Sequence, residues 1–360
     1  MTNKLLPARG FDTVLMRYLP QLLCFEVKPS YMYTKADYMR LLVNSSVLNA
    51  YAEGMSNASK KIVGCDGVPN SDTALMRFKS IDRYELQSVV SIVLEEQVNE
   101  LKAKGLLNRT VPIAFDWHDQ MFYGEKETDM VNGTRPKDGS CYAYQYLTAS
   151  ILVDGKRLTI VLTPIKSREH LLDYVKDALN RIRNMGVRVR YLLFDGGFSS
   201  LDLPAFLEEN GYTYLVHFTP NSLTKRIGLA DGESVSYPCD RPFKLVRVDD
   251  EETRISYLFA TNMTCKPKRL LKRYKSRWGV ETSYRGHNLF LPMTKSKNYT
   301  VRLLYYSVAV CIYNVWCILN ALENNCVVNN KEEQKNVHVT AFELKLLILL
   351  TFLIPAVTYG

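Results

Sequence analysis

The chain has 360 residues and a mass of 41.3 kDa, which is enough for one large domain or two and for a substantial hydrophobic core. Hydrophobic residues make up 47% of the sequence and charged residues 23%, so a wholly disordered chain is excluded. The formal net charge of +9 favours a polyanionic partner.

The N-terminal part of the sequence has helical patterns. Thr34 precedes Asp37 at the spacing of a capping box, which predicts the start of a helix. A loop rich in Gly, Pro, Asn and Ser separates it from a second helical stretch at Asp72 to Lys104. We therefore expect a helical domain over residues 1–108. A DNA reader of the helix-turn-helix kind has this pattern, as does any helical cap.

Short apolar runs typical of strands begin at Val111. An Asp-Gly pair between two of these runs indicates a hairpin. In chain order the patterns predict strands at 111–116, 142–153, 157–163, 189–195 and 212–218, with helices at 170–185 and 200–210. This order predicts an α/β fold with a mixed sheet and helices on its faces.

The last third of the chain adds short strands and then helices. Residues 222–263 have the pattern of a β-rich insertion, and helical patterns return around Glu281 and after Ala341. Between these helices, Leu303 to Leu322 contains no charged residue and is long enough to span a bilayer. Because it contains two Asn residues, we expect a buried helix that packs on the core and no membrane partner.

The basic surplus of the chain lies in one segment, from Thr261 to Arg302. This segment contains eleven Lys or Arg residues against one acid, Glu281. Charge runs are usually solvated faces, but Tyr274, Trp278 and Tyr284 interrupt this one, as stacking on nucleotides would require. The segment therefore favours nucleic acid or another phosphate-rich partner.

Two compositional features concern location. The eight cysteines include no C-x-x-C pair, which argues against a zinc site of the usual spacing and favours reduced thiols. The first ten residues are too interrupted to form a signal peptide, so we expect a cytoplasmic protein.

Two carboxylates stand where predicted strands end, at Asp116 and Asp195. A strand-end Asp is often only a turn or helix cap, but the carboxyl ends of strands are also where an open α/β sheet displays its functional groups. With Glu281 they would form a hard-oxygen site suited to two Mg²⁺ or Mn²⁺ ions, which support in-line phosphoryl transfer. Asp119 is the alternative to Asp116, which we prefer because the apolar run ends there.

Helical spacing gathers further groups around Glu281. Tyr274, Arg277, Glu281 and Arg285 follow one another at intervals of three or four residues, which would place them on one helical face. Such a face could bind phosphate or be an ordinary salt-bridge ladder. Trp278 could stack on a displaced base or belong to the core.

The string from Tyr274 to Arg285 resembles the Y-x2-R-x3-E signature of insertion-sequence transposases of the DDE type, the IS-four-like group. The stretches Phe115 to Asp119 and Leu193 to Phe198 are similar to the first and second acidic motifs of that family. The resemblance covers about residues 110–320. It implies a ribonuclease-H-like core that carries Asp, Asp and Glu, with a β-rich insertion between the second Asp and the Glu.

The resemblance departs from the family pattern at one position. Seven residues after Glu281 the pattern has a Lys, whereas this chain has Asn288. Arg285 could supply the missing charge, and Asn288 could still donate to a phosphate oxygen. The departure bears on whether this copy is active.

Together these patterns predict three domains: 1–108, a ribonuclease-H-like catalytic domain at 109–325 with the insertion at about 222–263, and a helical tail at 326–360. The expected function is a DNA transposase that cleaves element ends and transfers the 3′-hydroxyl to target DNA. The alternatives are a structure-specific nuclease and an inactive DNA-binding remnant.

The expected partner is double-stranded DNA (terminal inverted repeats and target), bound by a homodimer at the nucleoid. The expected metal ligands and catalytic residues are Asp116, Asp195 and Glu281, and the expected DNA contacts are Tyr274, Arg277, Trp278, Arg285, Asn288, Lys272 and Lys275.

Overall fold

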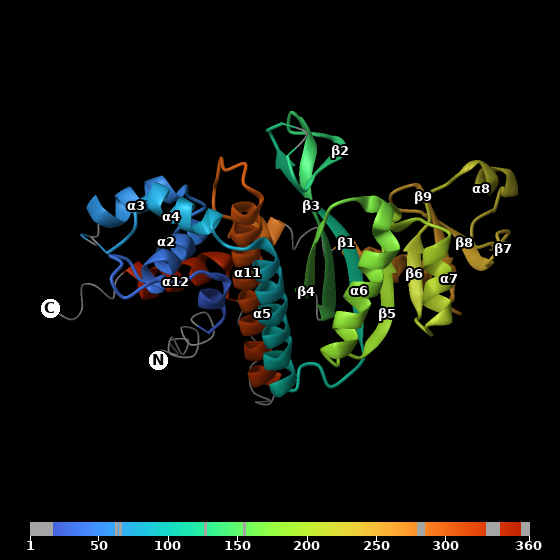
Figure 1. The fold of residues 1–360 in the computed structure, drawn as a ribbon. Helices are drawn as coiled ribbons and strands as arrows, with labels where there is room; N and C mark the ends of the chain where they lie inside the picture. The colour runs from blue at the N-terminus through green and yellow to red at the C-terminus, as the bar shows by residue number, and fades with distance from the viewer. Residues whose placement is uncertain are drawn as a thin grey trace. The chain divides into compact units, whose positions relative to one another are not determined.

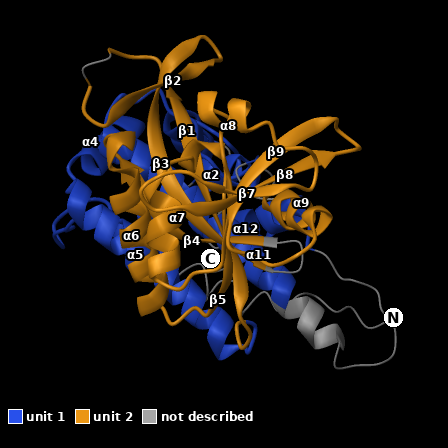
Figure 2. Cartoon of the chain, turned by 90° about the vertical axis from the view of Figure 1, so that its right-hand side faces the viewer, with its two compact units in different colours: residues 1–106, 284–360 blue, residues 107–283 orange. Residues whose placement is uncertain are grey.

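The computed structural model describes residues 17–61, 64, 67–125, 128–153, 156–278, 285–328 and 339–353. The chain divides into two compact units, which Figure 2 colours separately. The helical unit comprises residues 1–106 and 284–360, and the sheet unit comprises residues 107–283.

Helices from both ends of the chain build the helical unit. The capping box is present, with Thr34 at the N-cap and Asp37 bonded back to the Thr34 backbone. Asp82 accepts from the backbone N–H groups of Tyr84 and Glu85 and begins a new helix, so the predicted stretch at 72–104 forms two helices. The elements drawn in Figure 1 are η1 Leu19–Leu22, α2 Lys35–Val47, α3 Ala52–Lys61, α4 Ser71–Lys79, α5 Arg83–Ala103, α11 Tyr299–Val328 and α12 Ala341–Leu353.

The long apolar helix α11 is the core of the helical unit. It packs against α2, α4 and α5. Its Asn314 side chain donates to Gln97 Oε1 at 2.8 Å, and Gln97 in turn donates to the Cys311 carbonyl at 3.1 Å. The Asn320 side chain donates to the Val339 carbonyl and accepts from the Val339 backbone N–H. These bonds satisfy the polar groups that burial would otherwise penalise.

By length and composition alone, α11 is the one helix in the described part of the chain that could cross a membrane. The apolar stretch, Tyr299–Ala321, has a mean hydropathy of 1.5 and is 89% buried inside the protein. The expectation of a buried helix therefore agrees with the structure. Helix α11 belongs to the helical unit.

The unit boundaries follow from the same packing. The first boundary falls at Leu106 and Leu107, beside the predicted one. The second falls at residues 283 and 284, whereas the predicted catalytic domain continued to residue 325. The difference arises because the apolar faces of the helices after residue 284 are buried against N-terminal helices.

One mixed sheet runs through the whole sheet unit. Its strands are β1 Val111–Phe122, β2 Val131–Lys137, β3 Ser140–Val153, β4 Lys156–Ile165, β5 Val189–Phe194, β6 Tyr214–His217, β7 Ser234–Tyr237, β8 Phe243–Asp250 and β9 Ile255–Thr261. The order is β2-β3-β1-β5-β6-β9-β8-β7, and β4 pairs with β3. The predicted mixed α/β fold is confirmed.

Two parts of the sheet differ in detail from the prediction. Strand β1 continues past Asp116 to Phe122, because its second half pairs with β3 from Trp117–Leu147 to Phe122–Tyr142. The predicted insertion contains β7, β8, β9 and the short helix α8 Ser222–Ile227. It extends the main sheet, since β9 pairs with β6.

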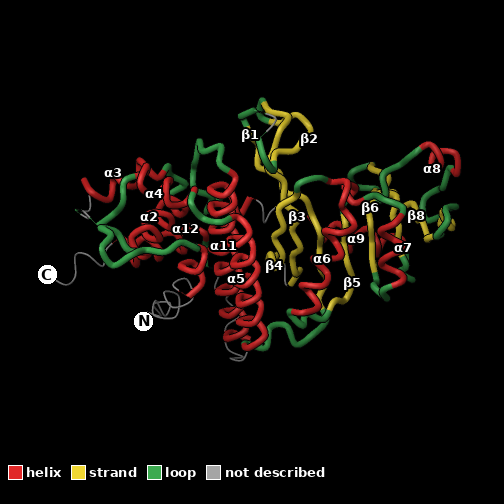
Figure 3. Tube along the Cα trace, viewed as in Figure 1, coloured by secondary structure: helices red, strands yellow, loops and turns green. Residues whose placement is uncertain are grey.

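Helices and short turns cover the strands and complete the unit. Helix α6 Leu171–Asn184 packs on β4, α7 Asp202–Glu209 packs on β6, and α9 Pro267–Lys275 packs on β8. Figure 3 shows these helices in red alongside the yellow strands. The remaining elements are 3₁₀ turns, η2 Arg168–His170, η3 Gly196–Phe198 and η4 Ser276–Trp278.

Candidate active site

The parallel pairing of β1 with β5 and of β5 with β6 stops at one level in the centre of the sheet. Phe115 of β1 pairs with Phe194 of β5, and Phe194 pairs with Val216 of β6. Asp116 follows Phe115 in the sequence, Asp195 follows Phe194, and His217 follows Val216. The register therefore brings Asp116 and Asp195 to one edge of the sheet, as the sequence predicted, and adds His217.

Asp116 is buried, with 5% of the residue exposed. Its Oδ1 accepts from the Trp117 backbone N–H at 2.9 Å, and its Oδ2 accepts from Arg277 Nη1 at 2.9 Å. The side chain of Arg277 is 5% exposed and that of Asp116 is 7% exposed. Removing one partner of such a buried pair costs far more than it does in a surface pair, because the other charge is left buried without compensation.

Asp195 caps the turn η3. Its Oδ1 accepts from the Gly197 backbone N–H at 3.0 Å. A Cβ atom on Gly197 would lie 2.8 Å from Trp117 Cδ1, so only glycine fits at this position without a shift. The Trp117 ring also stacks on Phe198, with centroids 4.6 Å apart. The turn is therefore fixed from both sides, and Asp195 with it.

The charges of both carboxylates, Asp116 and Asp195, affect the pKa of Arg277. Burial by itself lowers the pKa of Arg277, but the charge of Asp116, followed by those of Tyr274 and Asp195, outweighs burial and raises this pKa above its ordinary value. The guanidinium carbon lies 5.3 Å from the centre of the Tyr274 ring. This edge of the sheet therefore stabilises positive charge.

His217 is a site residue that the sequence reasoning missed. Its Nδ1 lies 3.2 Å from the Tyr274 hydroxyl. Burial, followed by the charge of Arg277, lowers the pKa of the imidazole. Burial also raises the pKa of Tyr274 to about 12. One signal in the sequence points to His217, which is a polar residue near the end of the apolar run at 212–218.

Asp119, the alternative to Asp116, lies three residues farther along β1 and has a different environment. Its carboxylate accepts from Thr134 Oγ1 at 2.5 Å and from Gln145 Nε2 at 3.0 Å, and it forms an ion pair with Arg168 at 3.3 Å. Successive side chains of a strand point to opposite faces, so Asp119 faces away from Asp116. The structure therefore does not place Asp119 beside Asp116 and Asp195.

Only part of the predicted helical face around Glu281 lies within the described residues. Helix α9 ends at Lys275, and the turn η4 carries Arg277. Glu281 and the side chain of Trp278 lie outside the described residues. Arg285 and Asn288 are exposed and belong to the helical unit.

The two lysines predicted to contact DNA from α9 differ in environment. Lys272 is exposed. Lys275 forms ion pairs with Asp250 at 2.8 Å and Glu252 at 3.2 Å. Part of the basic surplus in the sequence is thus compensated by acids from the β8–β9 turn.

No group of three His, Cys, Asp or Glu side chains that could hold a metal occurs within the described stretches. The third predicted ligand, Glu281, is outside them. The described part of the site therefore offers two carboxylates, Asp116 and Asp195, with a buried cation beside them.

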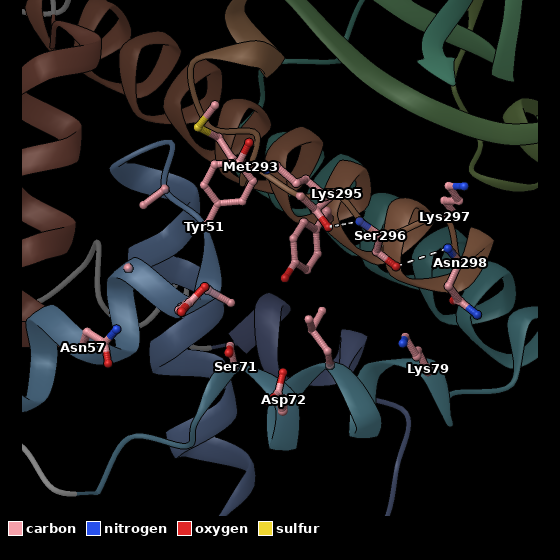
Figure 4. A pocket seen from close by; sticks show the side chains of 17 residues that line it. Tyr51, Asn57, Ser71, Asp72, Lys79, Met293, Lys295, Ser296, Lys297 and Asn298 are labelled. Atoms are coloured by element: carbon pink, nitrogen blue, oxygen red, sulfur yellow. Dashed lines mark hydrogen bonds between the residues drawn. The ribbon is translucent and has the colours of Figure 1, made fainter. Parts of the chain in front are cut away.

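The helical unit contains a separate pocket with a volume of about 960 Å³. It is lined by the start of α3, by α4, by the segment before α11 and by Tyr305 of α11, and Figure 4 shows the side chains that line it. Lys79, Lys295 and Lys297 contribute positive charge, whereas Glu53 and Asp72 contribute negative charge. The balance of charge gives no clear preference for one class of ligand.

Comparisons with known proteins agree with this geometry. A model of the family described as "Transposase DDE domain" matches residues 111–290. Among solved structures, the chain is similar to a piggyBac transposase in a synaptic complex with hairpin DNA. The identity is 14% and the TM-score 0.59, and the match covers 98% of this chain and 80% of that chain, so the likeness is one of fold. No curated protein matches the chain.

Proposed function

Since the chain belongs to the transposase DDE domain family, we propose that it is a DNA transposase, which cleaves the ends of a mobile element and joins the freed 3′-hydroxyl to target DNA. The observation that carries the proposal is that Asp116 and Asp195 are level with each other, directly after Phe115 and Phe194, where the parallel pairing of β1 with β5 stops. The mixed sheet also supports the proposal that this core is ribonuclease-H-like.

The donor set fits divalent metal ions. Carboxylate oxygens are the ligands that Mg²⁺ and Mn²⁺ prefer, and the raised pKa of Arg277 supports a place where Asp116 and Asp195 favour positive charge. We propose that these two carboxylates and Glu281 hold two Mg²⁺ (or Mn²⁺) ions. Such ions, when bound, lower the pKa of a coordinated water and stabilise developing charge on phosphate oxygens.

The residues of the chain itself would bind and orient the DNA. Arg277 has five N–H donors, so it can keep its bond to Asp116 and donate to a phosphate as well. The Tyr274 hydroxyl, whose pKa is raised in part by the charge of Asp195, would contact the same phosphate. Further contacts to the DNA backbone are proposed for Lys272, Lys275, Trp278, Arg285 and Asn288.

The proposed partner is duplex DNA, namely the terminal inverted repeats and a target. The piggyBac structure with the similar fold is a synaptic complex with hairpin DNA, which supports a duplex partner for this chain. We also propose that a homodimer binds the DNA, at the nucleoid in the cytoplasm.

The carboxylate pair makes a direct test possible. Asp195→Asn should abolish cleavage of element ends in Mg²⁺ and leave DNA binding intact or improved, because it removes a metal ligand and one negative charge near phosphate. The matched control is Asp173→Asn, since the Asp173 side chain is 72% exposed on α6. Near-normal cleavage by the Asp195 variant would contradict the metal assignment.

The same assay separates the alternatives. The substrate is a duplex that carries the inverted repeats flanking the gene, with a second duplex as target. A transposase produces joined strands, a structure-specific nuclease produces cleavage without joining, and an inactive remnant only binds.

A further inference from the structure

We infer that His217 is a positioning residue, which holds the Tyr274 hydroxyl at the carboxyl edge of the sheet so that this hydroxyl can bind a terminal phosphate of the DNA. The inference rests on the proposed function and adds to it a residue outside the acidic motifs and the Y-x2-R-x3-E string.

The backbone places the imidazole beside the acidic turn. Val216 pairs with Phe194, so His217 is level with Asp195. A Cβ atom on Gly196 would lie 3.3 Å from His217 Nδ1. The glycine therefore lets the turn that carries Asp195 approach the imidazole closely.

Aromatic rings fix the orientation of the imidazole. Its centre lies 5.4 Å from those of Tyr257 and Tyr274 and 6.2 Å from that of Phe259. With the ring held, Nδ1 lies 3.2 Å from the Tyr274 oxygen, within hydrogen-bonding distance. Tyr274 itself is only 3% exposed, so its hydroxyl has few orientations open to it.

The hydrogen-bonding capacity of the pair leaves a proton for a ligand. A neutral imidazole has one N–H donor and one acceptor nitrogen. In the tautomer with the proton on Nδ1, His217 donates to the tyrosine oxygen, and the hydroxyl proton can be donated to a phosphate oxygen. The lowered pKa of His217 agrees with a neutral ring.

The contact also completes a path across the site. His217 contacts Tyr274, the guanidinium of Arg277 lies over the Tyr274 ring, and Arg277 pairs with Asp116. This path joins the end of β6 to the middle of β1 through the two residues that match the family string. A change at His217 should therefore reach phosphate binding through Tyr274.

The experiment measures binding of duplex DNA with a 5′-phosphate or a 5′-hydroxyl at its ends, by fluorescence anisotropy without metal. The affinity ratio of the two probes isolates the contribution of a terminal phosphate. His217→Phe keeps an aromatic ring but removes the hydrogen bond, and we expect it to lower this ratio about fivefold. His217→Asn keeps a polar group near Nδ1 and should retain the ratio within about twofold.

Two further variants separate positioning from packing. Tyr274→Phe should lower the ratio as much as His217→Phe, and the double variant should lose no more than either one, because the two residues act as a unit. His170→Phe is the matched control, since His170 is 66% exposed, and it should bind as the parent does. Thermal unfolding of each variant verifies that it is folded.

The outcomes separate this inference from the proposed function. A folded His217→Phe variant with the parent's phosphate preference would overturn the inference, and so would a loss in His217→Asn equal to that in His217→Phe. A parent protein without phosphate preference would overturn it as well. The proposed function is judged independently, by whether the parent cleaves and joins DNA and Asp195→Asn does not.

Discussion

At the scale of single residues, the site is organised by one buried ion pair. From its spacing to Tyr274 and Glu281, the sequence predicted that Arg277 lies on a helical face that binds DNA phosphates. In the structure Arg277 is 4% exposed and bonded to Asp116. A one-dimensional pattern does not reveal such a pair, because the partners are 161 positions apart in the sequence.

The pair predicts a stability effect. Arg277→Gln should lower the free energy of unfolding by about 3–5 kcal/mol, because it leaves the Asp116 carboxylate buried without its cation. Urea unfolding of the metal-free protein measures this. Adding Asp116→Asn to Arg277→Gln should recover part of the loss, since the buried charge is then gone.

The control for this pair is an exposed one. Arg241 bonds Asp202 and Glu209 at the surface, and Arg241→Gln should leave the unfolding midpoint almost unchanged. Equal effects of the Arg241 and Arg277 substitutions would show that the buried pair contributes no special stability.

At the scale of elements, the sequence was informative where one local rule decides the outcome. The capping box at Thr34 and the apolar run before Asp195 each predicted an element that is present. The ends of elements depend on partners that the local sequence does not contain. Strand β1 continues through Asp116 because β3 pairs with it, and α9 ends at Lys275 although the basic pattern continues.

A substitution in the turn η3 should lower activity even though it leaves both carboxylates in the sequence. In Gly197→Ala the new methyl group would lie 2.8 Å from Trp117 Cδ1, so the turn that carries Asp195 must shift. A shift of even part of an ångström at a reacting group is costly, and cleavage should fall about tenfold or more. The rate of end cleavage under single-turnover conditions measures this.

Gly133→Ala is the matched control for Gly197→Ala, because nothing lies within 4 Å of a Cβ atom at Gly133. Cleavage by this control should match the parent. If Gly197→Ala also cleaves at the parental rate, the turn can adapt and the position of Asp195 does not depend on the glycine.

At the scale of the whole molecule, the basic segment is divided between the two units. Its first part, through Arg277, belongs to the sheet unit, and its last part, from Arg285, belongs to the helical unit. Within the first part, Lys268 and Lys275 pair with acids from the β8–β9 turn. These acids precede the segment in the sequence, so a count of the charges inside the segment does not include them.

This distribution predicts different salt dependences for two lysines of the same helix. The affinity of a protein for duplex DNA falls with salt at a slope near −0.9 per phosphate contact, because each contact releases condensed counterion. Lys272→Gln should flatten that slope by about 0.9, since Lys272 is exposed and its charge is available to a phosphate. Lys275→Gln should change the slope less, because Lys275 already neutralises Asp250 and Glu252. Binding of one duplex over a series of NaCl concentrations measures both, and an equal flattening by the two variants would mean that Lys275 leaves its acidic partners for the DNA.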